Sequence, residues 1–177
     1  MKLPECRIEM ATSEEESRYT LNGVFYDVKK ERLVATDGHM LAVLPHKAEA
    51  SDVGGVIPTD AFRDARKLAK KAKKRKTDLA ILQEADTITF SVEGLQSATF
   101  DLVKGQFPNY EAIIPKEIPK FTVALNAELL YKLAMALQEE SMIVHLHIGD
   151  KDSVIVVKPS AAKDSIGLLM PCKAFTE

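Results

Sequence analysis

The chain has 177 residues, of which 46% are apolar and 28% charged, and its formal net charge is −2. This length allows one domain or a domain and a half with a sizeable core, and the composition is typical of a soluble globular protein. We find no apolar run of membrane-spanning length and no signal-peptide core in the first ten residues, so we expect a cytoplasmic protein. Cys6 and Cys172 lack CxxC spacing, which predicts two reduced thiols rather than a disulfide framework or a zinc site.

The first third of the chain is predicted to form three strands, at residues 19–28, 33–36 and 39–44. β-branched and apolar side chains occupy the last two segments on either side of Asp37-Gly38, a dipeptide that favours the positive φ of a tight hairpin turn. These two strands are therefore expected to pair antiparallel. Within the first strand, Asn22-Gly23 marks either a bulge or a tight turn.

The rest of the chain contains an internal repeat, in which Lys67-Leu68-Ala69 recurs as Lys132-Leu133-Ala134. Each copy reads strand, helix and then three strands. In the first copy these are residues 55–58, 60–76, 78–82, 87–92 and 98–103; in the second they are 120–125, 127–139, 142–148, 153–158 and 165–171. One copy alone could not bury its apolar face. We therefore expect an α+β domain at 55–177, built from βαβββ units 55–115 and 120–173 about a pseudo-twofold axis, with residues 1–54 as a strand block at its edge.

The first helix of the repeat has an apolar side and a cationic side. Its apolar stripe begins at Phe62 and continues at helical spacing to Ala72, and Thr59 is the expected N-cap. Seven basic residues lie on the other side, namely Arg63, Arg66, Lys67, Lys70, Lys71, Lys73 and Lys74. Such a face can contact nucleic-acid phosphates without reading sequence, or it can simply be solvated. The second helix offers little positive charge, and the basic residues lack the interleaved aromatics of a single-strand stacking platform.

Catalytic motifs are not recognisable in the sequence, which shows no Gly-rich phosphate loop, serine elbow or carboxylate pair. Asp37 lies beside His39, but the turn explains it better than acid–base chemistry does. His145 and His147 share one face of a predicted strand at a spacing that can bind a metal, without a third ligand close in sequence. We expect a non-enzymatic protein without cofactor, metal or catalytic residue. A metal-dependent hydrolase using the two histidines is the enzymatic alternative.

Three sequence blocks occur together in the order typical of one family: residues 18–44 with LNG and VATDGH, residues 105–115 (GQFPNYEAIIP), and residues 166–173 (IGLLMPCK). They resemble the middle domain and the end of the last domain of the bacterial β sliding clamp, the DNA polymerase III beta subunit. A clamp subunit resembles three such domains in tandem, each built from two βαβββ units. A chain of 177 residues cannot hold six units, so it resembles an abridged clamp. The resemblance implies a DNA-clamp-like fold whose basic helix faces the backbone of double-stranded DNA.

The resemblance also implies a pocket for clamp-binding-motif peptides of DNA polymerase or other replication proteins. Carried over residue by residue, its positions are Leu21, Thr36, Gly38, His39, Leu41, Pro115, Leu168, Met170 and Pro171. Aliphatic and Met side chains would give an adaptable apolar groove, and Thr36 and His39 would give its polar edges. The alternative is that these residues merely pack the core. Met40 stands where the family usually has Arg, which is a departure from the family pattern.

The function that follows from the resemblance is a non-catalytic sliding-clamp-like protein of DNA replication or repair. It would bind clamp-motif peptides and contact DNA non-specifically. The alternative is a decoy or regulator that binds the same peptides without encircling DNA. A homo-oligomer of the chain could close a ring of similar size, and a monomer, which could not encircle DNA, is equally compatible with the sequence.

Overall fold

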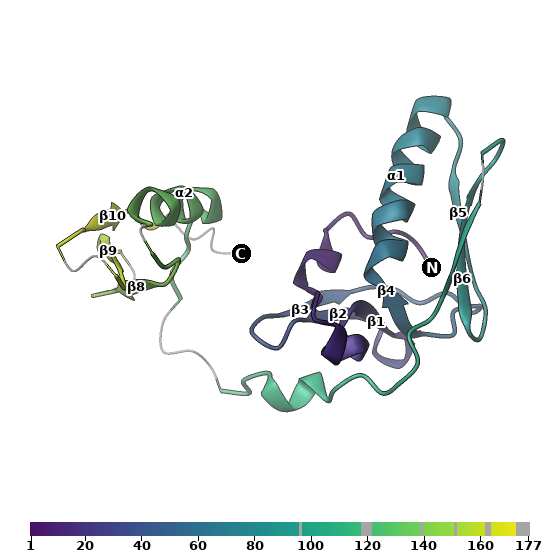
Figure 1. Ribbon diagram of the computed structural model, residues 1–177, viewed down its shortest axis with the longest axis horizontal. Coiled ribbons are helices and arrows are strands. Elements are labelled where there is room, and N and C mark those ends of the chain that lie inside the picture. The colour runs from purple at the N-terminus through teal and green to yellow at the C-terminus, as the bar shows by residue number, and fades with distance from the viewer. Residues whose placement is uncertain (96, 118–121, 139, 151, 162–163, 173–177) are drawn as a thin grey trace. The chain divides into compact units, whose positions relative to one another are not determined.

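The computed structural model describes all residues except 96, 118–121, 139, 151, 162–163 and 173–177. It contains two units, Met1–Ile114 and Pro115–Glu177. Both combine helical segments with antiparallel sheet, so the predicted α+β class is confirmed (Figure 1). Among the described residues, no helix has both the length and the apolar character needed to cross a membrane.

The first sheet of the larger unit has the strand order β3-β2-β1-β4. Its strands are β1 (Gly23–Asp27), β2 (Arg32–Thr36), β3 (Leu41–Pro45) and β4 (Gly55–Pro58). β2 and β3 pair antiparallel, with Thr36 opposite Leu41, which confirms the predicted hairpin. β4 pairs with β1 and opens the first repeat, so the boundary expected at residue 54 falls inside one continuous sheet.

The strand predicted at residues 19–28 is wrong in its first part. Glu16–Leu21, labelled η2, forms short 3-10 turns on either side of a kink at Arg18, and β1 begins only at Gly23. Asn22 caps η2 through its backbone N–H, which donates to the Tyr19 carbonyl oxygen. A Cβ atom at Gly23 would lie 2.5 Å from the Ile57 carbonyl oxygen. The glycine is therefore needed for close approach of β1 and β4, not for a turn or a bulge.

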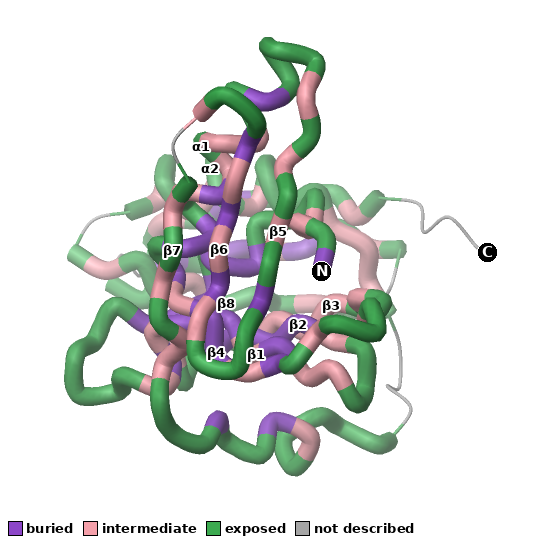
Figure 2. The backbone as a smooth tube through the Cα atoms, turned by 90° about the vertical axis from the view of Figure 1, so that its right-hand side faces the viewer, coloured by how far each residue is buried: buried purple, intermediate pink, exposed green. Residues whose placement is uncertain are grey.

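The second sheet of this unit consists of β5 (Leu79–Gln83), β6 (Thr87–Val92) and β7 (Ala98–Asp101), in the order β5-β6-β7. Helix α1 (Thr59–Arg75) packs against both sheets through its apolar side. Ala61, Phe62 and Ala65 are fully buried in a cluster that also contains Ile57 of β4 and Phe90 of β6. Figure 2 shows the buried backbone concentrated along β6 and around β1 and β2.

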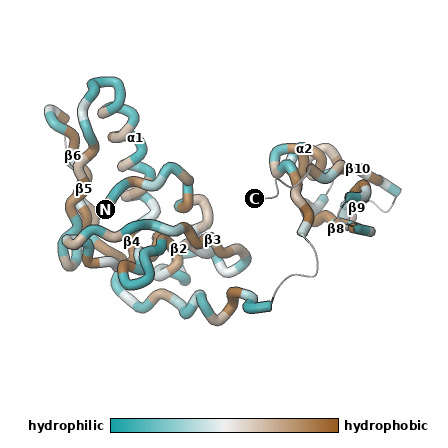
Figure 3. Tube along the Cα trace, turned by 180° about the vertical axis from the view of Figure 1, so that it is seen from behind, coloured by the Kyte–Doolittle hydropathy of each residue, from teal (hydrophilic) through white to brown (hydrophobic). Residues whose placement is uncertain are grey.

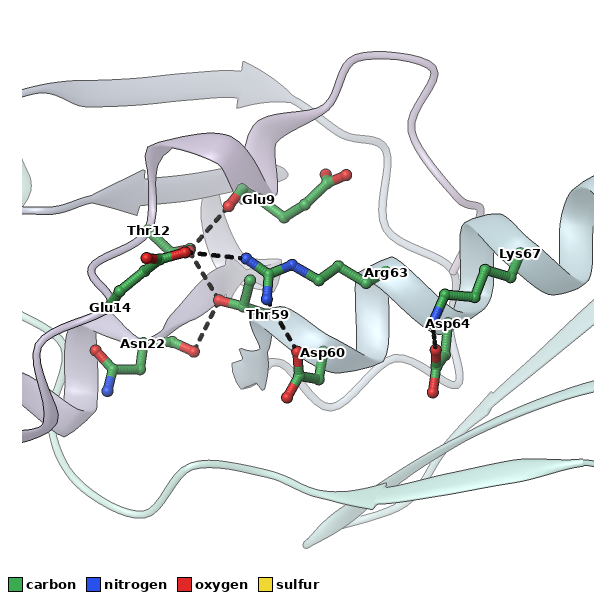
Figure 4. Close-up of polar contacts among 9 residues, drawn as sticks. All are labelled: Glu9, Thr12, Glu14, Asn22, Thr59, Asp60, Arg63, Asp64 and Lys67. Carbon is green, nitrogen blue, oxygen red and sulfur yellow. Dashed lines mark hydrogen bonds and ion pairs between the residues drawn. The ribbon is translucent and has the colours of Figure 1, made fainter.

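Thr59 is the first residue of α1 and not its N-cap, which corrects the prediction. The cap position belongs to Pro58, whose side chain makes no capping hydrogen bond. The Thr59 hydroxyl instead lies 2.9 Å from the Asn22 carbonyl oxygen and 2.8 Å from the Thr12 hydroxyl (Figure 4). The side chain therefore ties the start of the helix to the N-terminal segment.

The end of the larger unit is fixed on the first sheet. The ring of Phe107 stacks on Phe25 with centroids 5.0 Å apart. Tyr110 belongs to the short helix η4 (Tyr110–Ile113), and its hydroxyl donates to a carboxylate oxygen of Asp27 at 3.0 Å. The block GQFPNYEAIIP thus serves to anchor the chain as it leaves this unit.

The smaller unit contains helix α2 (Ala127–Leu137) and a sheet in the order β10-β9-β8. Its strands are β8 (Val144–His147), β9 (Ile155–Pro159) and β10 (Gly167–Leu169). The Asn126 side chain caps α2 by accepting from two backbone N–H groups. Of the strand predicted at 120–125, residues 120 and 121 lie outside the described residues, as does residue 139 of the predicted helix. Only an isolated bridge, Ala124 to Cys172, is described at that strand's other end.

Candidate peptide-binding and nucleic-acid interfaces

The loop that joins β2 to β3, residues 37–40, is fixed by its own side chains. One carboxylate oxygen of Asp37 accepts from the backbone N–H groups of His39 and Met40, both at 2.8 Å. These hydrogen bonds lower the pKa of the Asp37 carboxyl. The Thr36 hydroxyl donates to the Met40 carbonyl oxygen at 2.6 Å and accepts from the Gly38 N–H at 3.0 Å. The loop is therefore preorganised, and Asp37 has the structural role expected of a turn residue.

The geometry of this loop differs from the tight two-residue turn favoured by its sequence. Thr36 still pairs with Leu41, so four residues lie between the strands. Among the loop residues only Gly38 has a positive φ, of 93°. Thr36 is buried, with 9% of its surface exposed, and its hydroxyl is engaged within the loop, so it holds the loop in shape instead of forming an open polar edge.

Arg18 is a site residue that the sequence reasoning missed. Its Nη1 atom donates to the Asp37 carbonyl oxygen at 3.0 Å, and its Nε atom lies 3.0 Å from a Glu15 carboxylate oxygen. A Cβ atom at Gly38 would lie 2.5 Å from the same Nη1 atom. Gly38 therefore gives the guanidinium room to hold the loop. Its position at the start of residues 18–44, the first block that resembles the clamp family, was the sequence feature that could have identified it.

The two leucines predicted for the pocket in this unit belong to a hydrophobic cluster with Val34 and Phe107. Leu21 is 9% exposed and packs the core, which agrees with the alternative that the predicted pocket residues are core residues. Leu41 is half-buried at the edge of this cluster. His39 and Met40 are exposed at the tip of the loop. The surface that this unit offers is thus the His39–Met40 tip with Leu41 at its base.

The remaining predicted pocket residues belong to the smaller unit. Leu168 and Met170 flank the buried Leu169 of β10 and are 62% and 66% exposed. Alternate side chains of a strand point to opposite faces, so these two point away from the core of their own sheet. Core packing does not account for them. Pro171 is half-buried and Pro115 is exposed.

The basic side of α1 is less uniform than the sequence indicated. Six of the seven predicted basic residues are exposed, and Arg66 is the exception, with 19% of its side chain accessible. Its guanidinium forms an ion pair with the Glu9 carboxylate and donates to the carbonyl oxygens of Pro4 and Cys6. Burial favours a raised pKa for Glu9, but the hydrogen bonds and charge of Arg66 outweigh it and lower the pKa. Arg66 therefore acts as an internal anchor.

Two more of these cations are matched by carboxylates. Arg63 lies between Asp60, at 3.2 Å, and Glu14, at 3.3 Å, and Lys67 binds Asp64 at 2.6 Å (Figure 4). The other four, which are Lys70, Lys71, Lys73 and Lys74, form no ion pair with any residue that the structure describes. Figure 3 shows the C-terminal end of α1 as strongly hydrophilic. The unpaired positive charge of the helix is thus concentrated in its second half.

The two histidines considered for a metal site lie on β8, and both are exposed. His145 Nε2 is 3.5 Å from the Ser160 hydroxyl. Within the described part of the chain, no group of three or more His, Cys, Asp or Glu residues could hold a metal ion.

A helix seated on two antiparallel sheets, one of which carries a Thr-Asp-Gly-His hairpin, defines a clamp-like α+β fold. Residues 6–109 match the family model described as DNA polymerase III beta subunit, central domain. The chain belongs to this beta sliding clamp family.

Relatives and solved structures agree with this assignment. The beta sliding clamp of Caulobacter vibrioides is 30% identical over 172 residues, which are 90% of this chain and 45% of that protein. The beta sliding clamp of Rickettsia bellii is 29% identical over 150 residues, with coverages of 80% and 39%. A crystal structure of the Caulobacter crescentus clamp has a TM-score of 0.74 and 25% identity and covers 93% of this chain and 46% of its own. A Bartonella birtlesii sliding clamp bound to griselimycin has a TM-score of 0.70 and 27% identity, with coverages of 92% and 46%. The chain spans less than half the length of these relatives.

Proposed function

We propose that this member of the sliding clamp family is a non-catalytic protein of DNA replication or repair that binds clamp-motif peptides of polymerases or other replication proteins. The exposure of Leu168 and Met170 is the observation that carries this proposal. Leu168 and Met170 are two residues apart and therefore lie on one face, and adjacent exposed apolar side chains of this kind form patches that mark protein-binding surfaces. The preorganised loop fixes the backbone from which the exposed His39 side chain projects, so ordering that backbone costs little conformational entropy on binding.

The second part of the proposal is non-specific contact between α1 and the backbone of double-stranded DNA. Its support is the cluster of exposed lysines in the second half of the helix, which lack ion-pair partners among the described residues. Such side chains displace condensed counterions from DNA without reading base sequence. The cytoplasmic location expected from the sequence stays a prediction.

A fluorescently labelled clamp-motif peptide tests the peptide site. We expect saturable binding that is weakened at least tenfold by His39→Glu and by Met170→Lys. The matched controls are His147→Glu and Met142→Lys, which make the same changes at exposed positions outside the proposed site. Absence of saturable binding, or equal affinity of site and control variants, would show that the chain has no such peptide site.

A decoy that binds replication peptides without encircling DNA is the second candidate function. It is favoured by the engagement of Arg63, Arg66 and Lys67 with carboxylates, which reduces the charge available for DNA. A loading assay on circular DNA separates the two functions: a clamp is retained on the circle, whereas a decoy slows the polymerase and is not retained. Light scattering adds the solution mass, since a stable monomer could not encircle DNA.

A further inference from the structure

Helix α2 has two apolar sides, of which only one is packed. Leu130, Leu133 and Leu137 face the sheet of the smaller unit and join its buried cluster. Tyr131 and Met135 form a second stripe, one turn apart, and are 61% and 44% exposed. None of the 11 residues of α2, all of which the structure describes, is buried. The helix therefore carries more apolar surface than its own sheet covers.

The sheet is also incompletely covered, at its β8 edge. α2 packs on β9 and β10, and a Cβ atom at Gly167 of β10 would lie 2.8 Å from the side chains of Leu133 and Leu137. Leu146 of β8 is paired with the buried Val157, so its side chain points to the core face of the sheet, yet it is 39% exposed. Among the described strands β8 pairs with β9 alone, so its other backbone edge is free.

These two bare surfaces adjoin each other. Around the helix, Leu130 lies between Leu133 and Tyr131. Because Leu133 meets β10 at one side of the sheet, Tyr131 lies on the side of α2 that is turned toward β8. Tyr131, Met135 and Leu146 therefore form one apolar surface beside a free strand edge, which we call the α2–β8 surface.

The internal repeat shows what occupies the equivalent side of α1. In the register of the repeat, Arg66 and Lys70 of α1 correspond to Tyr131 and Met135 of α2. Arg66 binds the N-terminal segment of the chain through the Glu9 carboxylate, so that side of α1 has a polar partner. Apolar side chains at the same positions of α2 call for an apolar partner. The first repeat cannot supply it through its own apolar side, which the two sheets of the larger unit already enclose.

We propose that the α2–β8 surface binds the same surface of a second copy of this chain about a twofold axis. Antiparallel pairing of the two β8 edges would join two three-stranded sheets into one, with both α2 helices on the same face. A twofold axis makes such a contact self-complementary, because each free edge and each apolar stripe meets its own counterpart. The charged residues of α2, Glu128 and Lys132, form an ion pair with each other at 2.6 Å, so the helix brings no unpaired charge to the contact. This inference goes beyond the proposed function and does not rest on it.

The size of the surface predicts a weak dimer. Burying an aromatic side chain removes about 200 Å² from water, so the exposed part of Tyr131 offers about 120 Å². Met135, Leu146 and the edge of a four-residue strand add to this area, which stays below the about 800 Å² per partner of a standard interface. We therefore expect a dissociation constant of about 10–100 μM. Leu168 points to the other face of the sheet, so the dimer leaves it accessible.

The solution mass, measured by sedimentation equilibrium against concentration, tests the dimer. We expect 19.6 kDa at about 1 μM and an approach to twice that mass at about 1 mM. Tyr131→Lys and Met135→Lys should each weaken the dimer about tenfold or more, because each places a charge in the apolar contact. The matched control is Leu168→Lys, at a position 62% exposed on the opposite face, which should leave the dissociation constant unchanged. Circular dichroism verifies that each variant is folded.

Amide hydrogen exchange locates the contact. Between the same two concentrations, exchange in β8 should slow, whereas exchange in β5, an edge strand of the larger unit, should stay the same. A constant mass of 19.6 kDa, or equal weakening by Tyr131→Lys and Leu168→Lys, would overturn the proposal. Slowing in β5 instead of β8 would assign the dimer to another surface and overturn it as well. Since neither peptide nor DNA is present, these outcomes leave the proposed function untouched.

Discussion

Replacing Glu9 with Gln removes the charge of the carboxylate that anchors the N-terminal segment and leaves the side-chain shape almost unchanged. The Glu9 carboxylate is 2% exposed and binds an Arg66 side chain that is 19% exposed. A Gln at this position offers one acceptor, and its amide N–H groups would face the N–H groups of the guanidinium. The substitution therefore leaves a mostly buried cation without its counter-charge.

The magnitude follows from the burial of the pair. Breaking a fully buried ion pair costs about 3–5 kcal/mol. Because Arg66 retains some contact with water, we expect about 2–3 kcal/mol for Glu9→Gln. With a urea m-value of about 2 kcal/mol/M, the unfolding midpoint of the larger unit should fall by about 1–1.5 M. Since the chain has no Trp, circular dichroism is the appropriate probe.

The control is Glu14→Gln, which makes the same chemical change in an ion pair to Arg63. The Glu14 side chain is 86% exposed, so its substitution should cost less than about 1 kcal/mol. Equal midpoints for the two variants would refute the assignment of Glu9–Arg66 as a structural anchor.

The pH dependence gives an independent check of the same pair. The folded pKa of Glu9 is lowered from its usual 4.5, so its carboxylate stabilises the fold at neutral pH. That contribution is lost as the pH falls through the folded pKa. The stability gap between the unmodified chain and Glu9→Gln should therefore be widest near pH 7 and narrow below pH 4.5. A gap that widens on acidification would contradict this sign.

Two further substitutions test the hairpin loop and the core, each by urea unfolding. The positive φ of Gly38 alone should make Gly38→Ala destabilise the larger unit by about 1–2 kcal/mol. The contact between the new methyl group and the Arg18 guanidinium should add a further cost. The additional cost should disappear in an Arg18→Ala background; strict additivity of the two changes would exclude the contact as its cause. Phe62→Ala should cost about 3–5 kcal/mol because Phe62 is fully buried. Leu82→Ala, at a position 58% exposed, should cost at most about 0.5 kcal/mol, and similar losses for the two would contradict the described core.

Local sequence patterns were sufficient to predict the position of most helices and strands. The predicted strands 55–58 and 87–92 agree with β4 and β6 at both ends, and the predicted helix 60–76 is displaced by one residue from α1. These segments have clear periodicity and are bounded by turn residues, so the information that defines them is local. The hairpin at Asp37-Gly38 was recognisable for the same reason, although its four-residue loop was not.

The errors arise where distant contacts override local preference. Tyr19 to Leu21 have strand-like composition, yet they form part of η2, and Leu21 is buried in a cluster with Phe107. A helical wheel places Arg66 on the cationic side of α1, but its partner Glu9 is 57 residues away in the chain. Arg18 reaches the loop at Asp37 across 19 residues. Sequence periodicity carries no information about such pairs.

The small core of the second unit has a consequence for the order in which parts of the chain open. Among the residues described there, Ile155, Val157 and Leu169 form the buried cluster, supported by partly buried leucines of α2. So little buried surface should allow this unit to open at a lower free energy than the larger one, with faster amide hydrogen exchange in β9 and β10. A peptide that binds Leu168 and Met170 would then act as a folding ligand for this unit, and its affinity would include the free energy of closing it.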